Sequence, residues 1–274
     1  SQVVADIAGI AQKDIRMVMG DTAQVPYGGG TYGSRGAGVG GEAALRAATV
    51  FRANMLRIAA SLLQASPDDL ELQDSVVHVK GHHDKRLDMR QIADVAFFKP
   101  DQLPKDLQPL LSSSGHFTQL SDTFVFTNGF QASHIELDVH TGMVRLLDHW
   151  AVEDCGRIIN PLLVDEQIRG GVAQGIGSAL FEECLYDERG QLVNGSLVDY
   201  LTPSSATLPD IHVGHVETPT QTSTLGAKGA GEAGTAGAPA AVLNAINDAM
   251  APFGAEIFEM PATPERILKA LQRL

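Results

Sequence analysis

The sequence predicts an α+β fold of mixed sheets and helices, with glycine-rich loops at the N-termini of helices. Apolar residues recur at helical spacing over residues 42–63, whereas apolar and polar residues alternate over 134–149. Two segments with many glycines, 26–41 and 226–237, each run directly into a stretch with helical character. With 274 residues, the chain is long enough to bury a sizeable core in one large domain or two ordinary ones.

Residues 1–130 are predicted to form a first lobe, built around the glycine loop at 26–41 and the long helix at 42–63. The pair His82-His83 is interpreted as part of a surface turn rather than as a metal site, because no third ligand stands nearby. The other elements predicted in this lobe are the end of a helix at 1–12, an apolar strand at 15–19, a turn at 66–69, a strand at 76–79 and a helix at 89–97.

Residues 131–274 are predicted to form a second lobe, which carries Glu232. The alternation over 134–149 predicts a hairpin with one solvent-exposed face, and His134, His140 and His149 are placed on that face. The other elements predicted in this lobe are a helix at 162–180, strands at 192–198 and 211–216, a helix at 240–250 with Pro239 in its first turn, and a final helix capped by Thr263.

The helix at 162–180 contains an unusual number of small residues, including glycines at 170, 171, 175 and 177. Each glycine costs a helix roughly 1 kcal/mol relative to alanine, so another element is expected to approach this helix closely. Gln167 and Gln174 are seven positions apart and share one face, from which their amides could meet a planar heterocycle. Plain solvent exposure is the alternative for both glutamines.

The first glycine loop contains eight glycines between Gly28 and Gly41. Ser34 and Arg35 are its polar members, and a guanidinium beside glycine backbone is a common way to hold a phosphate or another oxyanion. The alternative is a flexible linker, but a linker would be polar and rich in serine, without Tyr32 and Arg35. The composition therefore favours a binding loop.

The second glycine loop places one amine, Lys228, and one carboxylate, Glu232, among five glycines between Gly226 and Gly237. A glycine loop that opens onto a helix presents N–H groups and the positive end of the helix dipole, which suits an anion. A packed turn with a solvated glutamate and lysine is the alternative. Because both glycine loops lead into helices, the sequence suggests that they share one ligand.

The charge balance of 20 Lys and Arg against 33 Asp and Glu, a net charge of −13, argues against binding to nucleic acid or to an anionic membrane surface. Two cysteines are too few for a disulfide framework, so a reducing, cytoplasmic location is expected. No apolar run has the length of a membrane span. The first residues lack Met and begin inside an amphipathic pattern, which suggests a fragment or a processed subunit.

Four separated motifs together resemble the molybdenum-binding large subunit of the xanthine dehydrogenase family, in its C-terminal part. The closer likeness is to bacterial carbon monoxide dehydrogenase-like subunits and to aldehyde or N-heterocycle hydroxylases. The motifs are Gly20-Asp21-Thr22 with Pro26 and Gly30-Thr31-Tyr32-Gly33-Ser34-Arg35, then Asp154-Cys155-Gly156-Arg157-Ile158-Ile159-Asn160-Pro161, then Gln167 with Gly170-Gly171-Val172-Ala173-Gln174-Gly175-Ile176-Gly177, and Lys228-Gly229-Ala230-Gly231-Glu232.

The resemblance implies a molybdopterin cofactor with molybdenum, in the cytosine dinucleotide form that is usual in bacteria. It implies that Glu232 is the catalytic base, and that no side chain of this chain ligates the metal. The residues expected to bind the cofactor are Gly33, Ser34 and Arg35 in the first loop, Gln167 and Gln174 on the helix, and Lys228 and Gly229 in the second loop.

The resemblance also implies a hydroxylation in which water supplies the oxygen and an aldehyde, an N-heterocycle or carbon monoxide is oxidised. Electrons would leave through an iron–sulfur subunit and an FAD-containing flavin subunit. The N-terminal half of the molybdenum subunit is a further expected partner, so this chain alone should hold an incomplete site. The competing hypothesis is a non-catalytic module that binds a nucleotide or phosphate, or that only packs against a partner.

Overall fold

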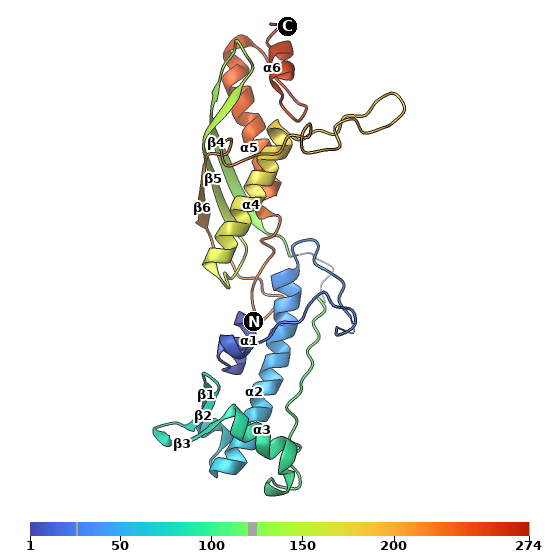
Figure 1. The fold of residues 1–274 in the computed structure, drawn as a ribbon. Helices are drawn as coiled ribbons and strands as arrows, with labels where there is room; N and C mark the ends of the chain where they lie inside the picture. The colour runs from blue at the N-terminus through green and yellow to red at the C-terminus, as the bar shows by residue number, and fades with distance from the viewer. Residues whose placement is uncertain (26, 120–124, 274) are drawn as a thin grey trace. The chain divides into compact units, whose positions relative to one another are not determined.

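The computed structural model describes residues 1–25, 27–119 and 125–273, so Pro26 of the first glycine loop lies outside the described residues. The chain folds as two compact units, which are described separately (Figure 1). Unit 1 comprises Ser1–Tyr32, Gly36–Asp122 and Thr222–Leu225, and unit 2 comprises Gly33–Arg35, Thr123–Gln221 and Gly226–Leu274. The division into lobes at residue 130 stays a prediction.

Unit 1 combines three helices with a small antiparallel sheet of order β1-β2-β3. Its core lies between the long helix and the sheet, where Met55, Ile58, Val77 and Ile92 are almost completely buried. The elements are α1 (Gln2–Ala8), α2 (Glu42–Leu63), β1 (Leu70–Gln73), β2 (Val76–Val79), β3 (His82–Asp88) and α3 (Met89–Phe98), with short 3₁₀ helices at Gln12–Asp14, Pro67–Asp69 and Pro100–Gln102.

The long helix α2 has the predicted bounds, and its start is unusual. The glycines before it form a π-helical turn, Gly36–Gly41, that continues directly into α2. Glu42, the first residue of α2, is completely buried, and its Oε2 accepts a hydrogen bond from the N–H of Leu225 at 2.8 Å. Burial by itself raises the pKa of Glu42, but bonds from Leu225 and Thr224 lower it overall.

Unit 2 is a three-stranded sheet of order β4-β5-β6, with two helices packed on one face (Figure 1). The hairpin strands β4 and β5 are antiparallel, as predicted, and β6 pairs with β5 in parallel. The elements are β4 (Asn128–Leu137), β5 (Val144–Asp154), α4 (Pro161–Leu180), β6 (Asp210–His215), α5 (Ala233–Met250) and α6 (Pro264–Ala270), with a 3₁₀ helix at Ala251–Phe253.

The small residues of α4 meet α5, which confirms the predicted close approach. A Cβ added to Gly171 would lie 3.0 Å from the Cα of Gly234. A Cβ added to Gly234 would lie 2.2 Å from the carbonyl oxygen of Ile168. Because these neighbours are backbone atoms, only glycine fits at this contact. The first turn of α5 is therefore held directly against α4.

Three predicted elements are wrong. Residues 15–19 form no strand, since no neighbouring strand pairs with them, and Met17 and Met19 are exposed. Residues 192–198 form only an isolated bridge, between Tyr186 and Leu192. His82-His83 begins β3 rather than lying in a turn.

The start predicted for the helix that contains Pro239 is also wrong. Helix α5 begins at Ala233, directly after Glu232, and Pro239 lies inside it. Proline cannot donate a backbone hydrogen bond within the helix. Its ring packs at Gly175, where an added Cβ would lie 2.9 Å from Pro239 Cδ, so tertiary packing compensates for the lost bond. The helix therefore reaches the glutamate instead of starting after a separate loop.

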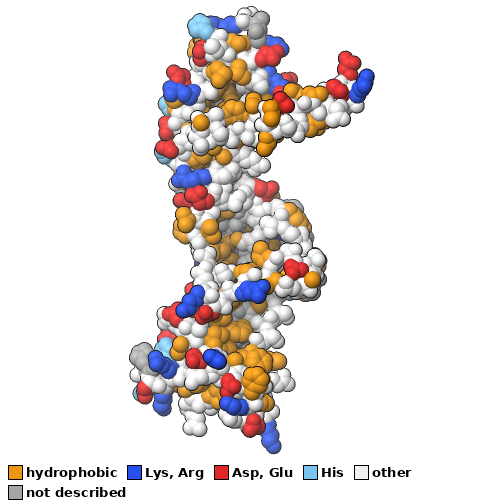
Figure 2. All heavy atoms as spheres, in the orientation of Figure 1, with side chains coloured by type: hydrophobic (Ala, Val, Ile, Leu, Met, Phe, Trp, Pro, Cys, Tyr) orange, Lys and Arg blue, Asp and Glu red, His pale blue; other side chains and the backbone are white. Residues whose placement is uncertain are grey.

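Between α4 and β6 the chain makes an extended arm, which leaves the helices of unit 2 at residue 181 (Figure 1). Hydrophobic side chains are visible along this arm in the space-filling view (Figure 2). Leu197 and Val198 are 83% and 87% exposed. None of the helices in the described ranges is both long and apolar enough to cross a lipid bilayer.

Candidate active site at the head of helix α5

Glu232 lies at the N-cap of α5 and is contacted by a residue almost two hundred positions earlier in the chain. The Oγ of Ser34 donates a hydrogen bond to Glu232 Oε2 at 2.6 Å. The same Oγ accepts the backbone N–H of Glu232 at 2.9 Å. Ser34 therefore binds both the backbone and the carboxylate of the residue that precedes the first turn of α5. This contact between the two side chains was not predicted, although both glycine loops were expected to share one ligand.

The segment Gly33–Arg35 reaches Glu232 through a sharp turn. Gly33 and Ser34 both have left-handed backbone conformations, with φ of 56° and 57°. A Cβ added to Gly229 would lie 2.7 Å from Ser34 Cβ, so glycine is needed there for Ser34 to approach. Arg35 is half-buried beside Ser34. Of the residues predicted to bind the cofactor, Gly33, Ser34, Arg35 and Gly229 are therefore brought together at Glu232.

The two glutamines of α4 have different positions relative to Glu232. The Nε2 of Gln167 donates to the carbonyl oxygen of Gly231 at 2.9 Å, next to the glutamate. Gln174 is exposed two turns further along α4, about 10 Å along the helix axis by helical rise. Only Gln167 is thus held at the head of α5, and Gln174 faces solvent on the same helix.

Lys228 lies in a polar cluster inside unit 2. Its side chain is 11% exposed, and its Nζ contacts Asp154 Oδ2 at 3.2 Å and Thr218 Oγ1 at 2.8 Å. Its backbone N–H donates to the carbonyl of Cys155 at 2.7 Å. The ammonium is therefore held by the protein itself, which differs from the solvated lysine of the alternative interpretation.

Asp154 is the centre of this cluster. It accepts hydrogen bonds from the N–H of Gly156 at 2.9 Å, and from both the N–H and the hydroxyl of Thr218. Burial by itself raises the pKa of this carboxyl, but the bonds from Thr218, Gly156 and Lys228 outweigh it and lower the pKa to about 2. The ionised carboxylate joins three loops just before Glu232.

A second polar network lies beneath α5, and none of its residues was predicted. Gln131 Nε2 donates to Glu153 Oε1 at 2.8 Å, and to the carbonyl oxygens of Ala233 and Gly234 at 3.3 and 3.0 Å. Glu153 is 3% exposed, and burial raises its pKa. In the sequence, Gln131 and Glu153 look like ordinary polar residues of a hairpin. The glycines at 129 and 237, which make room for them, were the available signal.

His149 belongs to the same network, so its predicted position on the solvent-exposed face is wrong. It is completely buried, and burial lowers the pKa of its imidazole to about 4. Its Nδ1 lies 2.9 Å from Ser133 Oγ, and its Nε2 lies 3.2 Å from Gln131 Oε1. A bulge in the pairing of β4 and β5 shifts the alternation between His134 and Ile135, and the sequence pattern does not show that shift.

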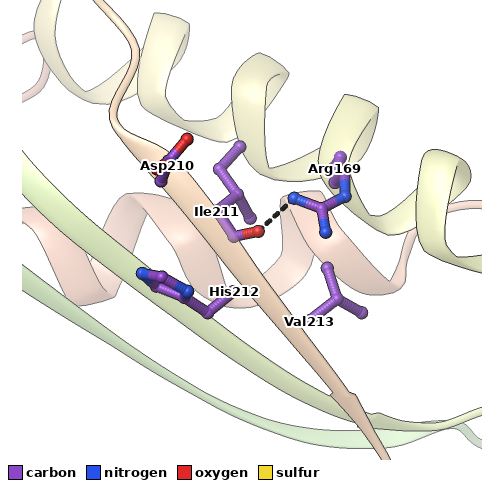
Figure 3. A pocket seen from close by; sticks show the side chains of 5 residues that line it. All are labelled: Arg169, Asp210, Ile211, His212 and Val213. Carbon is purple, nitrogen blue, oxygen red and sulfur yellow. Dashed lines mark hydrogen bonds between the residues drawn. The ribbon is translucent and has the colours of Figure 1, made fainter.

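A cavity lies elsewhere in unit 2. It has a volume of about 380 Å³ and lies between β6 and α4, where Arg169 donates a hydrogen bond to the carbonyl of Ile211 (Figure 3). Its lining consists of Arg169, Asp210, Ile211, His212 and Val213, and includes none of the predicted site residues. The cavity is open. The candidate site is therefore assigned from the side chains around Glu232 rather than from this cavity.

The residues at the head of α5 fit a large anionic or amide-rich ligand. Ser34, Arg35 and Gln167 are neutral or cationic hydrogen-bond donors around the glycine backbone. Within the described part of the chain, no three His, Cys, Asp or Glu side chains are grouped so that they could hold a metal ion.

Comparison with known families identifies the class of cofactor-binding domain. Residues 1–209 match the model of a molybdopterin cofactor-binding domain. The chain belongs to this family. The match includes Ser34, Gln131 and Gln167, whereas Lys228 and Glu232 lie beyond its last residue. Membership confirms the resemblance to molybdenum-binding subunits and the α+β fold expected from it.

Individual relatives agree with this assignment. The molybdopterin cofactor-binding domain is 42% identical over 272 residues to the nicotine 6-hydroxylase large subunit of Paenarthrobacter nicotinovorans, covering 98% of this chain and 33% of the relative. It is 33% identical over 272 residues to the carbon monoxide dehydrogenase large chain of Hydrogenophaga pseudoflava, covering 99% of this chain and 33% of the relative. Both relatives are named as the large subunit or large chain of an enzyme, a hydroxylase in one case and a dehydrogenase in the other.

The fold of the domain is also known from a crystal structure. Quinoline 2-oxidoreductase from Pseudomonas putida 86 superposes with a TM-score of 0.87 at 39% identity, covering 98% of this chain and 34% of that chain. The domain thus spans about a third of the length of the relatives that it matches. The competing hypothesis of a non-catalytic nucleotide-binding or partner-packing module finds no support in these comparisons.

Proposed function

We propose that this chain is the part of a molybdenum hydroxylase large subunit that supplies the general base, Glu232, and part of the cofactor cage. The observation that carries the proposal is the position of Glu232. Its carboxylate is exposed at the head of α5, and it is oriented by Ser34 at 2.6 Å. Residues 1–130 and 131–274 would be the two lobes of this part, in a cytoplasmic enzyme.

In the reaction, Glu232 accepts a proton from the water-derived oxygen nucleophile as that oxygen attacks the substrate carbon. Ser34 holds Oε2, so Oε1 is the oxygen that we assign to proton transfer. The molybdenum cofactor supplies, when bound, the two-electron redox chemistry that this chain's own side chains lack. The expected contribution of a positioned general base is about 10²–10⁴-fold in rate.

Residues around Glu232 would hold the cofactor. We infer that Gly33, Ser34 and Gly229 offer backbone to it, and that Arg35 and Gln167 offer hydrogen-bond donors. Gln174 would meet a more distant part of a long ligand, which agrees with the cytosine dinucleotide form. Lys228 would act indirectly, because its ammonium already contacts Asp154 and Thr218 and so fixes the loop that carries Gly229.

The substrate class is inferred from the relatives. The relatives with the higher identities, at 42% and 39%, are named for nicotine and quinoline, which are N-heterocycles. The carbon monoxide dehydrogenase large chain is 33% identical. We therefore propose an N-heterocycle as substrate, ahead of an aldehyde or carbon monoxide. The rest of the large subunit, an iron–sulfur subunit and an FAD subunit would complete the enzyme.

Glu232→Gln in the assembled enzyme tests the proposal. The amide keeps the shape and an oxygen that can accept from Ser34, but it cannot take up the proton. Turnover per molybdenum should fall about 10²–10⁴-fold while the molybdenum content stays near that of the parent enzyme. Glu188→Gln, in the exposed turn of the arm, is the matched control and should change neither quantity. Near-normal turnover per molybdenum in Glu232→Gln would remove the assignment of the base.

A second pair of variants tests the cofactor cage. Ser34→Val and Lys228→Ala remove contacts in or next to the cage, so they should lower molybdenum content. Metal analysis of the purified enzyme, normalised to protein, measures this directly. Unchanged metal content in both variants would show that this loop does not hold the cofactor.

A further inference from the structure

The buried network beneath α5 points to a residue that the proposed reaction does not yet include. Glu232 is tied to α5 by its carbonyl oxygen, which accepts the N–H of Ala236 at 3.1 Å. The position of the carboxylate therefore depends on the position of the first turn of α5. Gln131, from the edge strand β4, donates hydrogen bonds to the carbonyls of Ala233 and Gly234 in that turn.

We propose that Gln131 is a positioning residue for Glu232, because its amide fixes the first turn of α5 from below. The inference rests on the proposed function. The two hydrogens of one amide group are divided between Glu153 on one side and the two α5 carbonyls on the other. Gln131 thus joins the sheet to the helix directly behind the glutamate.

The orientation of the Gln131 amide is set by its neighbours. With an imidazole that is neutral at physiological pH, His149 Nε2–H donates to Gln131 Oε1, and Ser133 Oγ–H donates to His149 Nδ1. This order of donors turns the amide nitrogen toward Glu153 and α5. A reversed amide would place an oxygen against the carboxylate and two carbonyls, which all accept hydrogen bonds.

Two glycines support the same arrangement. A Cβ added to Gly237 of α5 would lie 2.9 Å from Gln131 Cδ, and one added to Gly129 of β4 would lie 1.9 Å from Glu153 Oε2. Each glycine leaves the space that one polar side chain of the network occupies. A glutamine that merely filled the core would not need a glutamate partner at 3% exposure, or acceptors on a neighbouring helix.

Gln131→Met in the assembled enzyme is the test, because methionine keeps the length of the side chain without its donors. Turnover per molybdenum should fall about tenfold to a hundredfold with little change in molybdenum content. Backbone amides in the first turn of α5 should exchange with deuterium faster than in the parent enzyme. Gln191→Met, at an exposed glutamine of the arm turn, is the matched control and should change neither readout.

A double-mutant cycle separates positioning from stability. If Gln131 acts through Glu232, Gln131→Met should change turnover less than about twofold when Glu232 is already glutamine. Gln131→Glu should lose as much activity as Gln131→Met, since it keeps the acceptor for His149 and loses the donors. Should Gln131→Met fail to fold, Ser133→Ala weakens the same chain of donors from its far end and should give a smaller loss in the same direction.

Three outcomes have different meanings. Gln131→Met could lower the melting temperature while turnover per molybdenum and amide exchange in α5 stay normal. That result would leave Gln131 only a stability role and overturn the inference. Independent losses in the double variant would do the same. If Glu232→Gln itself retains normal turnover, the assignment of the base fails, and amide exchange alone then decides whether Gln131 holds the turn.

Discussion

Lys228 and Glu232 belong to the same glycine-rich loop, but their charged groups have opposite environments. The ammonium of Lys228 is 11% exposed and contacts Asp154 and Thr218, whereas the carboxylate of Glu232 is exposed. Asp154 accepts several further hydrogen bonds, so the lysine end of the loop is rigidly held. At the other end, Ser34 holds one oxygen of Glu232.

The difference shows that two residues of one loop can have separate structural tasks. A buried ion pair whose carboxylate accepts further hydrogen bonds gives a loop a defined position, and it is costly to break because one charge is then left unpaired. An exposed carboxylate with a single orienting hydroxyl is free to exchange a proton. We infer that the Lys228 end supplies geometry and that the Glu232 end supplies chemistry. Four measurements follow from this contrast.

The largest expected effect is that of Asp154→Ala. It leaves the ammonium of Lys228 buried without its carboxylate, which typically costs about 3–5 kcal/mol of unfolding free energy. The single tryptophan, Trp150, lies in β5 of unit 2, so its fluorescence during denaturant unfolding measures the loss. Glu232→Gln is the control and should stay within about 0.5 kcal/mol of the parent. Equal losses in both variants would erase the contrast between the two ends.

Acid should weaken unit 2 through the same carboxylate. The pKa of Asp154 falls from 3.8 to about 2 on folding, so the ionised form stabilises the folded chain. At about 1.4 kcal/mol per pKa unit, this contribution is about 2 kcal/mol. It is complete above pH 4 and is lost as the pH falls toward 2. Unfolding free energies at several pH values should show the loss in the parent, and Asp154→Asn should lack that part of the slope.

A smaller effect is expected for Lys228→Met. Asp154 then keeps the bonds from Gly156 and Thr218, so the loss should be about 1–2 kcal/mol. The same Trp150 fluorescence measures it. A loss larger than that of Asp154→Ala would mean that the lysine, rather than the aspartate, organises the cluster.

The smallest effect is expected for Ser34→Ala, which removes two hydrogen bonds to Glu232. Their loss at an exposed site should cost about 1 kcal/mol. The factor by which turnover falls should be larger than the factor by which the folding equilibrium changes, because the orientation of Oε2 is lost. Thermal unfolding and turnover per molybdenum, measured on the same preparation, separate the two. Unchanged turnover would show that Glu232 needs no orienting hydroxyl.

The long, regular elements could be predicted from the sequence. Helix α2 has its predicted bounds, because apolar spacing defines its face and a run of glycines precedes it. Asn160 before Pro161 signalled the start of α4, where the asparagine side chain accepts the N–H of Leu163. The hairpin of β4 and β5 followed from alternation. These signals are local, so they can be recognised in a single sequence without knowledge of tertiary contacts.

The errors arise where tertiary contacts determine whether a segment forms a helix or strand and where that element begins. Local rules predict that a helix starts at Pro239. Instead, Pro239 lies inside α5 and is tolerated because its ring packs at Gly175 on α4. Residues 15–19 have strand-forming side chains but no partner strand. Among the site residues, loop composition indicated Ser34 and Glu232. Gln131 and Glu153 could not be found in this way, because their role depends on contacts between two strands and with α5.

The contact between Ser34 and Glu232 has a consequence for how this part of the enzyme can be divided. The chain passes between the two units five times, after residues 32, 35, 122, 221 and 225. Only three residues, Gly33–Arg35, leave the N-terminal sequence to join unit 2. A fragment starting at Thr123 would keep the glutamate, the sheet and both helices, yet it would lack the serine that orients the carboxylate. No single cut therefore yields a module that can be moved to another scaffold, because the proposed site needs Gly33–Arg35 as well as the segment that carries Glu232.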